Sequence, residues 1–89
     1  MDIEYTEIAI KDLLEFNEID RKLVVKKIEY LAENFEILKT TKKITELKGN
    51  HKGKYRFVVA RKIRVIFQVK NEEVLILVLR VGKRKDIYK

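Results

Sequence analysis

The chain of 89 residues contains no cysteine, no proline and a single histidine. Without cysteine it has no disulfide framework, no thiolate nucleophile and no zinc–thiolate site. His51 alone excludes a histidine-based metal cluster within one chain. It also excludes a ribonuclease mechanism that uses one histidine as base and a second as acid. We therefore expect no metal and no cofactor, and any chemistry must come from other side chains.

Long apolar runs are also missing, and no secretory signal is visible. No run approaches the roughly 18–20 apolar residues that span a bilayer. The start, Met1-Asp2-Ile3-Glu4, has no basic region followed by an apolar core. We expect a soluble, cytoplasmic protein with no membrane partner. The length predicts one domain over residues 1–89, with a core small enough that a bound partner would add to its stability.

Positive charge is what the chain has in excess, and it is concentrated in the second half. Residues 1–38 contain ten Asp or Glu and five Lys or Arg, a net charge of −5. Residues 39–89 contain four Asp or Glu and sixteen Lys or Arg, a net charge of +12. Evenly spread lysines would suggest simple solubility. Segregated charge instead favours a polyanion or an acidic protein as the partner.

The first half is typical of a short strand followed by two amphipathic helices. Ile3-Glu4-Tyr5 alternates like a strand that joins a later sheet. Thr6 can cap a helix that ends near Asn17-Glu18, and Asp20 is the expected cap of a longer helix. Apolar residues at helical spacing predict two core stripes, which are Ile8, Ala9, Leu13 and Phe16, then Leu23, Val24, Ile28, Leu31, Ala32, Phe35 and Leu38.

The second half predicts an antiparallel meander. Residues 39–43 suit a connecting loop, with Ile44 and Leu47 packed back on the core, and Gly49 and Gly53 mark a turn-rich segment. The predicted fold is α+β: an N-terminal strand, a two-helix hairpin, then a three-stranded antiparallel meander that forms one sheet packed on the helices. Short turns separate the three strands of this meander, which are 55–60, 63–69 and 74–81.

Alternation assigns the strand residues to two faces of the sheet. The helix-covered face takes Tyr55, Phe57, Val59, Ile63, Val65, Phe67, Val69, Leu75, Leu77 and Leu79. The opposite face takes Arg56, Val58, Arg64, Ile66, Gln68, Val74, Ile76, Val78 and Arg80. Cations mixed with exposed aliphatic residues favour a binding surface. The three arginines on that face are equally compatible with an ordinary solvated surface.

In this order of elements the chain resembles the RelE/ParE superfamily of toxins from prokaryotic toxin–antitoxin systems. The resemblance covers most of the chain, and its motifs occur in the expected order. They are L-K-G at 47–49, Y-R at 55–56, I-R-V-I-F-Q-V at 63–69, V-G-K-R at 81–84 and D-I-Y at 86–88. The V-G-K-R followed by tyrosine looks like the RelE branch, which cleaves mRNA in the ribosomal A site. The ParE branch shares the fold and poisons DNA gyrase.

The resemblance implies a type II toxin that is a metal-independent endoribonuclease (an mRNA interferase), acting with the ribosome to inhibit translation. It also implies a cognate antitoxin with an acidic contact surface, bound in a hetero-oligomer. Arg64 matches the family's catalytic strand arginine, and Arg84 matches the arginine of the G-K-R segment. Tyr88 matches the tyrosine that stacks on a base, and Arg56 matches a basic residue near the attacking hydroxyl.

Other assignments stay open. Val58 stands where some members have a second strand lysine, so the general base remains undecided among Lys54, Lys83 and Lys85. His51 suits either an ordinary loop residue or a contact with ribosomal RNA. The alternatives to the nuclease are a ParE-like gyrase poison and a non-catalytic RNA- or protein-binding member of the same fold. The lysines expected to bind RNA are Lys48, Lys52, Lys54, Lys83 and Lys85.

Overall fold

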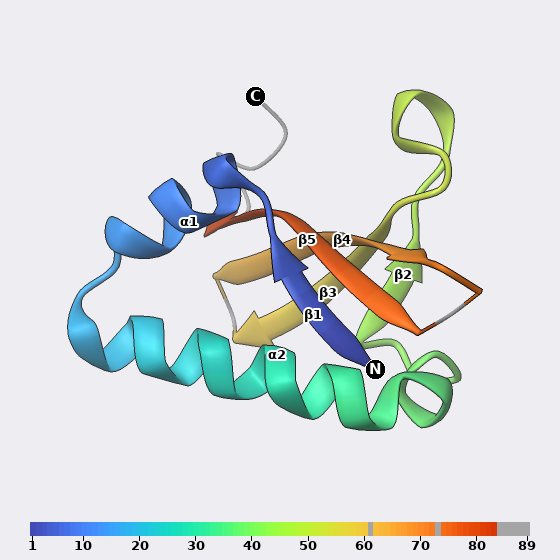
Figure 1. The fold of residues 1–89 in the computed structure, drawn as a ribbon, viewed down its shortest axis with the longest axis horizontal. Helices are drawn as coiled ribbons and strands as arrows, with labels where there is room; N and C mark the ends of the chain where they lie inside the picture. The colour runs from blue at the N-terminus through green and yellow to red at the C-terminus, as the bar shows by residue number, and fades with distance from the viewer. Residues whose placement is uncertain (61, 73, 84–89) are drawn as a thin grey trace.

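The computed structural model describes residues 1–60, 62–72 and 74–83. Within these residues, two helices lie against one mixed sheet (Figure 1). The predicted α+β fold is confirmed. The elements are β1 (Asp2–Tyr5), α1 (Glu7–Leu14), α2 (Glu18–Leu38), β2 (Ile44–Glu46), the 3-10 turn η1 (Gly49–His51), β3 (Tyr55–Ala60), β4 (Ile63–Lys70) and β5 (Leu75–Lys83).

The strands lie in the order β1-β5-β4-β3-β2. The first strand pairs in parallel with the last one, from Asp2↔Leu75 to Tyr5↔Val78, and this confirms that the N-terminal strand joins the later sheet. The pairs β5–β4 and β4–β3 are antiparallel, as predicted for the three-stranded meander, and β3 also pairs antiparallel with β2. Because β1 continues directly into α1, this pairing places the first helix next to the C-terminal part of β5.

Residues 44–46 correct the sequence interpretation, which assigned no strand between the helices and Tyr55. They form the edge strand β2, with Ile44 opposite Phe57 and Glu46 opposite Tyr55. Three residues are too few to show an alternating pattern, and short, polar edge strands are common because they resist pairing with other chains. Ile44 is buried, so its predicted packing on the core is confirmed.

The helix starts depend on side-chain caps. Thr6 is the cap of α1, as predicted, because its Oγ1 accepts a hydrogen bond from the Ala9 amide at 3.0 Å. For α2 the prediction of Asp20 is wrong. Asn17 is the cap, since its Oδ1 accepts from the Asp20 amide at 2.8 Å, and α1 has already ended at Leu14. Asp20 instead accepts from Asn17 Nδ2 at 3.2 Å, a reciprocal arrangement like a capping box.

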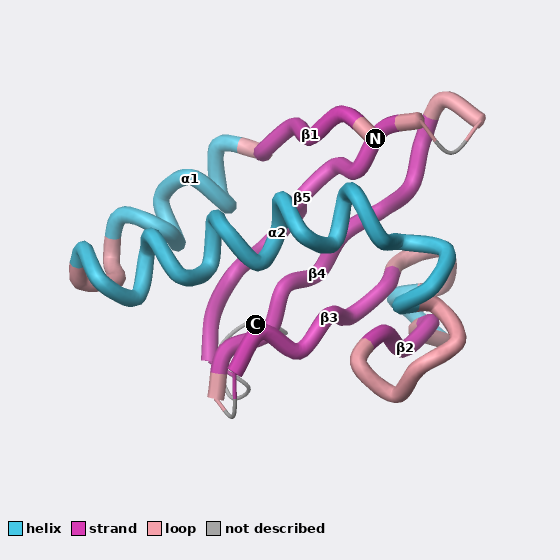
Figure 2. Tube along the Cα trace, turned by 90° about the horizontal axis from the view of Figure 1, so that it is seen from below, coloured by secondary structure: helices cyan, strands magenta, loops and turns pink. Residues whose placement is uncertain are grey.

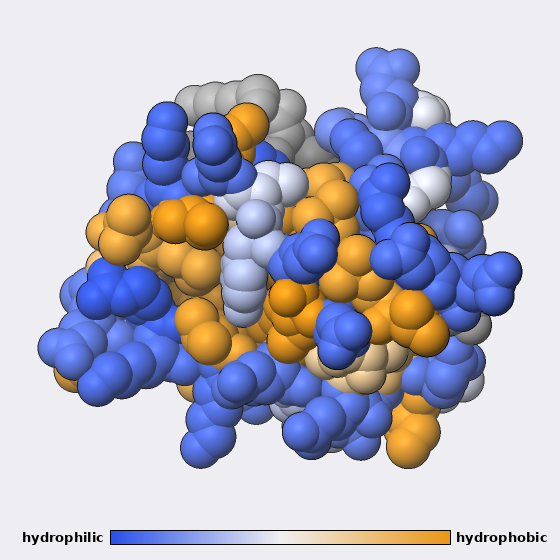
Figure 3. Space-filling model, in the orientation of Figure 1, coloured by the Kyte–Doolittle hydropathy of each residue, from blue (hydrophilic) through white to orange (hydrophobic). Residues whose placement is uncertain are grey.

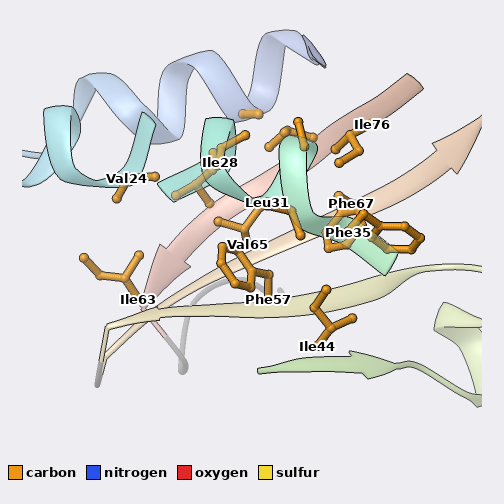
Figure 4. Close-up of a cluster of buried hydrophobic side chains, with 14 of the residues drawn as sticks. Val24, Ile28, Leu31, Phe35, Ile44, Phe57, Ile63, Val65, Phe67 and Ile76 are labelled. Carbon is orange, nitrogen blue, oxygen red and sulfur yellow. The ribbon is translucent and has the colours of Figure 1, made fainter. Parts of the chain in front are cut away.

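The core lies between α2 and one face of the sheet (Figures 2 and 4). Figure 4 shows Ile28, Leu31 and Phe35 of α2 directed toward the strands. The Phe35 ring meets Phe67 edge-on, with centroids 6.1 Å apart. Two members of the predicted stripes do not belong to this core: Ile8 is 54% exposed and Leu23 is 39% exposed. Both lie at the margin of their stripe, where spacing alone cannot separate buried from exposed positions.

The face assignment is confirmed for β3 and β4 but is wrong for the first part of β5. Ile76 and Val78, not Leu75, Leu77 and Leu79, belong to the core cluster. The pairing register shifts at Ile66/Phe67, where Arg80 is opposite Ile66 and Val78 is opposite Phe67. Leu79 is therefore the extra residue of a β-bulge, and the two parts of β5 have opposite parity. Alternation carried across the strand could not detect this change.

Candidate nucleic-acid interface

Three arginines lie on the sheet face opposite to α2. Arg56 pairs with Ile66 across β3 and β4, and Ile66 pairs with Arg80 across β4 and β5. Arg64, two residues from Ile66 on the same strand, is diagonal to both arginines. Residues two apart on a strand share a face, and diagonal neighbours lie within reach of long side chains. The structure thus brings together Arg56 and Arg64, as predicted, and places Arg80 beside them.

Arg64 is half-buried and is held at the β3–β4 turn. Its Nη1 donates to the carbonyl of Ala60 at 3.0 Å and to the carbonyl of Ile63 at 3.3 Å. Opposite Arg64 in the register lie Val58 on one side and Gly82 on the other. The glycine contributes no side chain opposite Arg64 on the β5 side.

The predicted exposed aliphatic residues on this face need correction. Ile66 is only 3% exposed, Val58 is half-buried, and Ile76 and Val78 lie in the core instead. Of that set, Val74 is the one with large exposure, at 55%, and it lies before β5 begins. The face is therefore arginine around a buried Ile66, not cations scattered over an apolar surface.

Arg80 has a carboxylate partner from the first helix. Its Nε donates to Asp12 Oδ2 at 2.9 Å and its Nη2 donates to Asp12 Oδ1 at 3.2 Å. Hydrogen bonding to Asp12 raises the pKa of Arg80 above its already high ordinary value, against the smaller, opposite effect of burial. Arg80 is therefore always charged and is already paired with an acid.

A cleft of about 680 Å³ opens next to this pair. Acidic residues of the helices, including Glu15, line one side, and Lys62 and Lys83 line the other. Lys83 is exposed at the end of β5, where the strand leads into the rest of the basic segment. The other members predicted from that segment, Arg84, Lys85 and Tyr88, lie outside the described residues.

Three predicted RNA-binding lysines belong to the connection between β2 and β3. Figure 1 shows this connection projecting beyond the sheet, and Figure 3 shows a hydrophilic surface there. Lys48 and Lys52 are exposed and Lys54 is half-buried. The Leu47 amide donates to the Lys54 carbonyl at 2.9 Å and closes the base of the loop. Lys54 lies four residues before Val58, which is opposite Arg64 in the register. Four residues span about 13 Å along an extended strand.

The loop conformation depends on its two glycines and on η1. Gly49 and Gly53 have φ values of +66° and +88°, which residues with a Cβ seldom adopt. His51 is half-buried within η1, and its amide donates to the Lys48 carbonyl at 3.3 Å. The loop backbone therefore has a defined shape, and His51 is part of it. Among the residues that the structure describes, no group of three His, Cys, Asp or Glu is placed to hold a metal ion.

Comparison with known families decides the identity at the level of a superfamily. Residues 3–88 match the family described as "ParE toxin of type II toxin-antitoxin system, parDE". The chain belongs to the ParE toxin family. This agrees with the RelE/ParE resemblance of the motifs and places the chain among the toxins of type II toxin–antitoxin systems. Among curated proteins, no sequence match is found.

Solved toxin structures share the fold of this family member. The YoeB–YefM heterotetramer from Staphylococcus aureus contains a chain with a TM-score of 0.72 and 24% identity, covering 94% of this chain and 97% of that one. A chain of the intact RelBE complex from E. coli has a TM-score of 0.68 and 24% identity, covering 92% of this chain and 94% of that one. The YoeB/ParE toxin from Agrobacterium tumefaciens has a TM-score of 0.72 and 20% identity, covering 94% of this chain and 99% of that one. At these identities the likeness concerns the fold.

Sequence reasoning missed two residues at the site of this ParE-family toxin. The alternation of β5 places Arg80 on the same face as Arg56 and Arg64 but indicates no role for it, and the helical pattern of the first half gives Asp12 no role. No motif marks their pairing, because 68 residues separate them in the chain.

No helix in the described part of the chain has the length and apolar character needed to cross a membrane.

Proposed function

We propose that this toxin is an endoribonuclease of the RelE type that cleaves mRNA in the A site of the ribosome, in the cytoplasm. The observation that carries the proposal is the placement of Arg56 and Arg64 as diagonal neighbours on the sheet face that the helices leave uncovered. Two guanidinium groups on rigid strands suit a phosphodiester, because each offers planar pairs of donors to phosphate oxygens.

The reaction is attack of a ribose 2′-oxygen on the adjacent phosphorus, with cleavage of the bond from phosphorus to the 5′-oxygen. A base takes the 2′ proton, an acid gives a proton to the leaving 5′-oxygen, and cations stabilise the negative charge that develops on the non-bridging phosphate oxygens. Arg64 is proposed to supply the positive charge at the scissile phosphate, and Arg56 is proposed to act near the attacking hydroxyl. The mechanism uses no metal ion.

The remaining roles belong to the basic segment after β5. Arg84 is proposed as a second clamp on the phosphate, and Tyr88 as the ring on which a base stacks, a contact worth about 1–3 kcal/mol. The base is proposed to be a lysine whose proton is loosened by neighbouring cations, with Lys54, Lys83 and Lys85 as candidates. Such weak acids and bases act mainly when the substrate is held in position, which fits cleavage on the ribosome.

The lysine loop is proposed to bind RNA, with Lys48 and Lys52 away from the scissile phosphate. These two lysines belong to the β2–β3 connection, which projects beyond the sheet (Figure 1), whereas Lys54, also a candidate base, closes the loop directly before β3. Phosphate contacts by lysine give affinity without sequence preference and make it strongly dependent on salt. The toxin would thus have a docking arm and a separate cleavage face.

A cognate antitoxin is proposed as the protein partner. Toxins of this fold have been solved in complex with antitoxins, in the RelBE and YoeB–YefM assemblies. The +12 charge of residues 39–89 predicts that the antitoxin contacts this chain through an acidic surface. A reading frame for a small acidic protein next to that of the toxin would support this pairing.

The second candidate is a gyrase poison, and the description of the matching family as ParE favours it. A third is a member of the fold that binds RNA or protein without catalysis. Primer extension on mRNA during translation separates the three. The nuclease gives discrete cuts within codons that Arg64→Ala and Arg84→Ala abolish and that Lys70→Ala, at the exposed end of β4, leaves unchanged. Inhibition of DNA supercoiling without such cuts would reject the nuclease in favour of the gyrase poison.

A further inference from the structure

We propose that Asp12 is a positioning residue, which fixes the end of β5 so that Arg64 and the start of the basic segment face one phosphate. The effect on cleavage rests on the nuclease function proposed above. The effect on the structure of β5 does not, and the two can be measured separately. Asp12 lies on α1 and is not one of the residues proposed to contact RNA.

One carboxylate organises two consecutive residues of β5. Asp12 Oδ2 accepts from the backbone amide of Val81 at 2.9 Å and from Arg80 Nε at 2.9 Å, while Oδ1 accepts from Arg80 Nη2 at 3.2 Å. The side chain of Asp12 is 14% exposed and that of Arg80 is 30% exposed, so water competes only partly for these bonds. Charge-assisted hydrogen bonds of this kind are about twice as strong as neutral ones.

The carboxylate acts where the neighbouring strand ends. The ladder of β1 reaches Val78, and Thr6 extends it by two bonds, from its amide to the Val78 carbonyl at 3.0 Å and from its Oγ1 to the Leu79 carbonyl at 2.9 Å. Beyond that point the chain has turned into α1, and the Val81 amide meets Asp12 in place of a strand. Thr6 also caps α1. The residue that ends the ladder therefore also fixes the start of the helix that carries Asp12.

The anchored residues follow directly after the β-bulge. The extra residue, Leu79, turns Arg80 to the face of Arg64 and Val81 into the core. A bulge weakens the ladder locally, so a register slip there would exchange these two side chains between faces. Asp12 binds both Arg80 and Val81 and therefore opposes such a slip. It also holds Gly82, the next residue, opposite Arg64.

Asp12 also separates Arg80 from the phosphate-binding cations. The pair uses the Nε edge of the guanidinium, and the carboxylate offsets a positive charge that would otherwise repel Arg64. Arg80 is thus a strut between β5 and α1 rather than a ligand for RNA. Because Asp12 also accepts from the Val81 amide, we expect the loss of Asp12 to have a larger effect than the loss of Arg80, and the double variant to resemble the loss of Asp12 alone.

The test compares Asp12→Asn, Asp12→Glu and Arg80→Gln with Glu15→Gln, which removes an exposed charge from the same helix end and cleft. Cleavage of ribosome-bound mRNA is followed in single turnover across toxin concentrations, and amide hydrogen exchange is measured at residues 81–83. For Asp12→Asn we expect a maximal rate that falls roughly 100-fold, with little change in the half-saturating concentration. Exchange at Val81 and Gly82 should accelerate, Asp12→Glu should recover part of the rate, and Glu15→Gln should behave as wild type.

Rates are expressed per folded molecule, from thermal melts of each variant. A normal rate per folded molecule in Asp12→Asn, or unchanged exchange at residues 81–83, would overturn the proposal. So would a double variant whose rate is much lower than that of either single one. If the wild-type toxin cuts no mRNA, the nuclease function fails, and the exchange data alone then decide whether Asp12 positions β5.

Discussion

Arg64 Nη1 lies 3.0 Å from the carbonyl oxygen of Ala60 and donates to it across the turn that joins β3 to β4. The cation proposed to bind phosphate therefore also braces the turn that leads into its own strand. A side chain held in this way loses little further freedom when a phosphate binds, and such preorganisation is what electrostatic catalysis requires.

Arg64→Lys should keep the charge and lose the function. A lysine offers a point charge without the planar set of donors that allows one guanidinium to hold a carbonyl and a phosphate oxygen together. We expect cleavage to fall roughly 100-fold. The free energy of unfolding should fall by about 1 kcal/mol through the lost turn bonds. Primer extension and urea unfolding measure the two effects, with Lys70→Arg as a control. Retention of cleavage in Arg64→Lys would show that fork geometry is not needed.

The lysine loop should govern binding and its salt dependence. Replacing Lys48, Lys52 and Lys54 together by glutamine should weaken ribosome binding and lower the slope of log K against log salt by roughly 2–3, for about three phosphate contacts. Because Lys54 is also a candidate base, a variant that changes only Lys48 and Lys52 should keep the maximal cleavage rate. A matched triple change of Lys11, Lys26 and Lys27, exposed on the helices, should leave the slope unchanged. Equal slopes in the two triple variants would mean that the loop is not a docking arm.

Asn17 should be worth more to stability than a nearby ion pair. Its Oδ1 caps α2 at the Asp20 amide, whereas Lys22 and Glu18 form an exposed pair at 2.9 Å. Asn17→Ala should lower the free energy of unfolding by about 1 kcal/mol. Lys22→Ala should change it by less than about 0.5 kcal/mol, because exposed pairs are screened by water and salt. Urea unfolding of both variants gives the comparison, and equal losses would contradict the capping role.

The parts of this molecule that were predictable from sequence follow local patterns. Helical spacing located Val24, Ile28, Leu31 and Phe35, which are all buried. Alternation placed Arg56 and Arg64 on one face of the sheet, and their register confirms it. Both patterns depend on residues a few positions apart, so a single chain displays them.

What the sequence did not reveal depends on pairings between distant segments. The bulge at Leu79 arises from the register of β4 with β5 and leaves no local mark. The strand at Ile44 exists because β3 lies beside it, and Asp12 reaches Arg80 because β1 carries α1 to the end of β5. Fold class was therefore accessible, while the supports of the site were not.

Tyr5 gives a prediction for stability at alkaline pH. Burial, and to a smaller extent the charge of Glu29, raises the pKa of Tyr5 above its ordinary value of 10.0. In the unfolded chain the phenol titrates at its ordinary pKa, so above about pH 10 the unfolded state binds fewer protons than the folded state. The free energy of unfolding must then fall as pH rises, and the contribution of Tyr5 is fully present only below that pH.

Tyr5→Phe should remove this part of the decline. The difference in unfolding free energy between wild type and Tyr5→Phe should stay constant from pH 8 to about 9.5 and then shift against wild type by up to about 1.4 kcal/mol per pH unit. Lysines that titrate in the same range cancel in this difference. Tyr30→Phe, at a 48% exposed position on α2, is the matched control and should stay parallel to wild type. If Tyr5→Phe also runs parallel to wild type, burial of the Tyr5 phenol does not control alkaline unfolding.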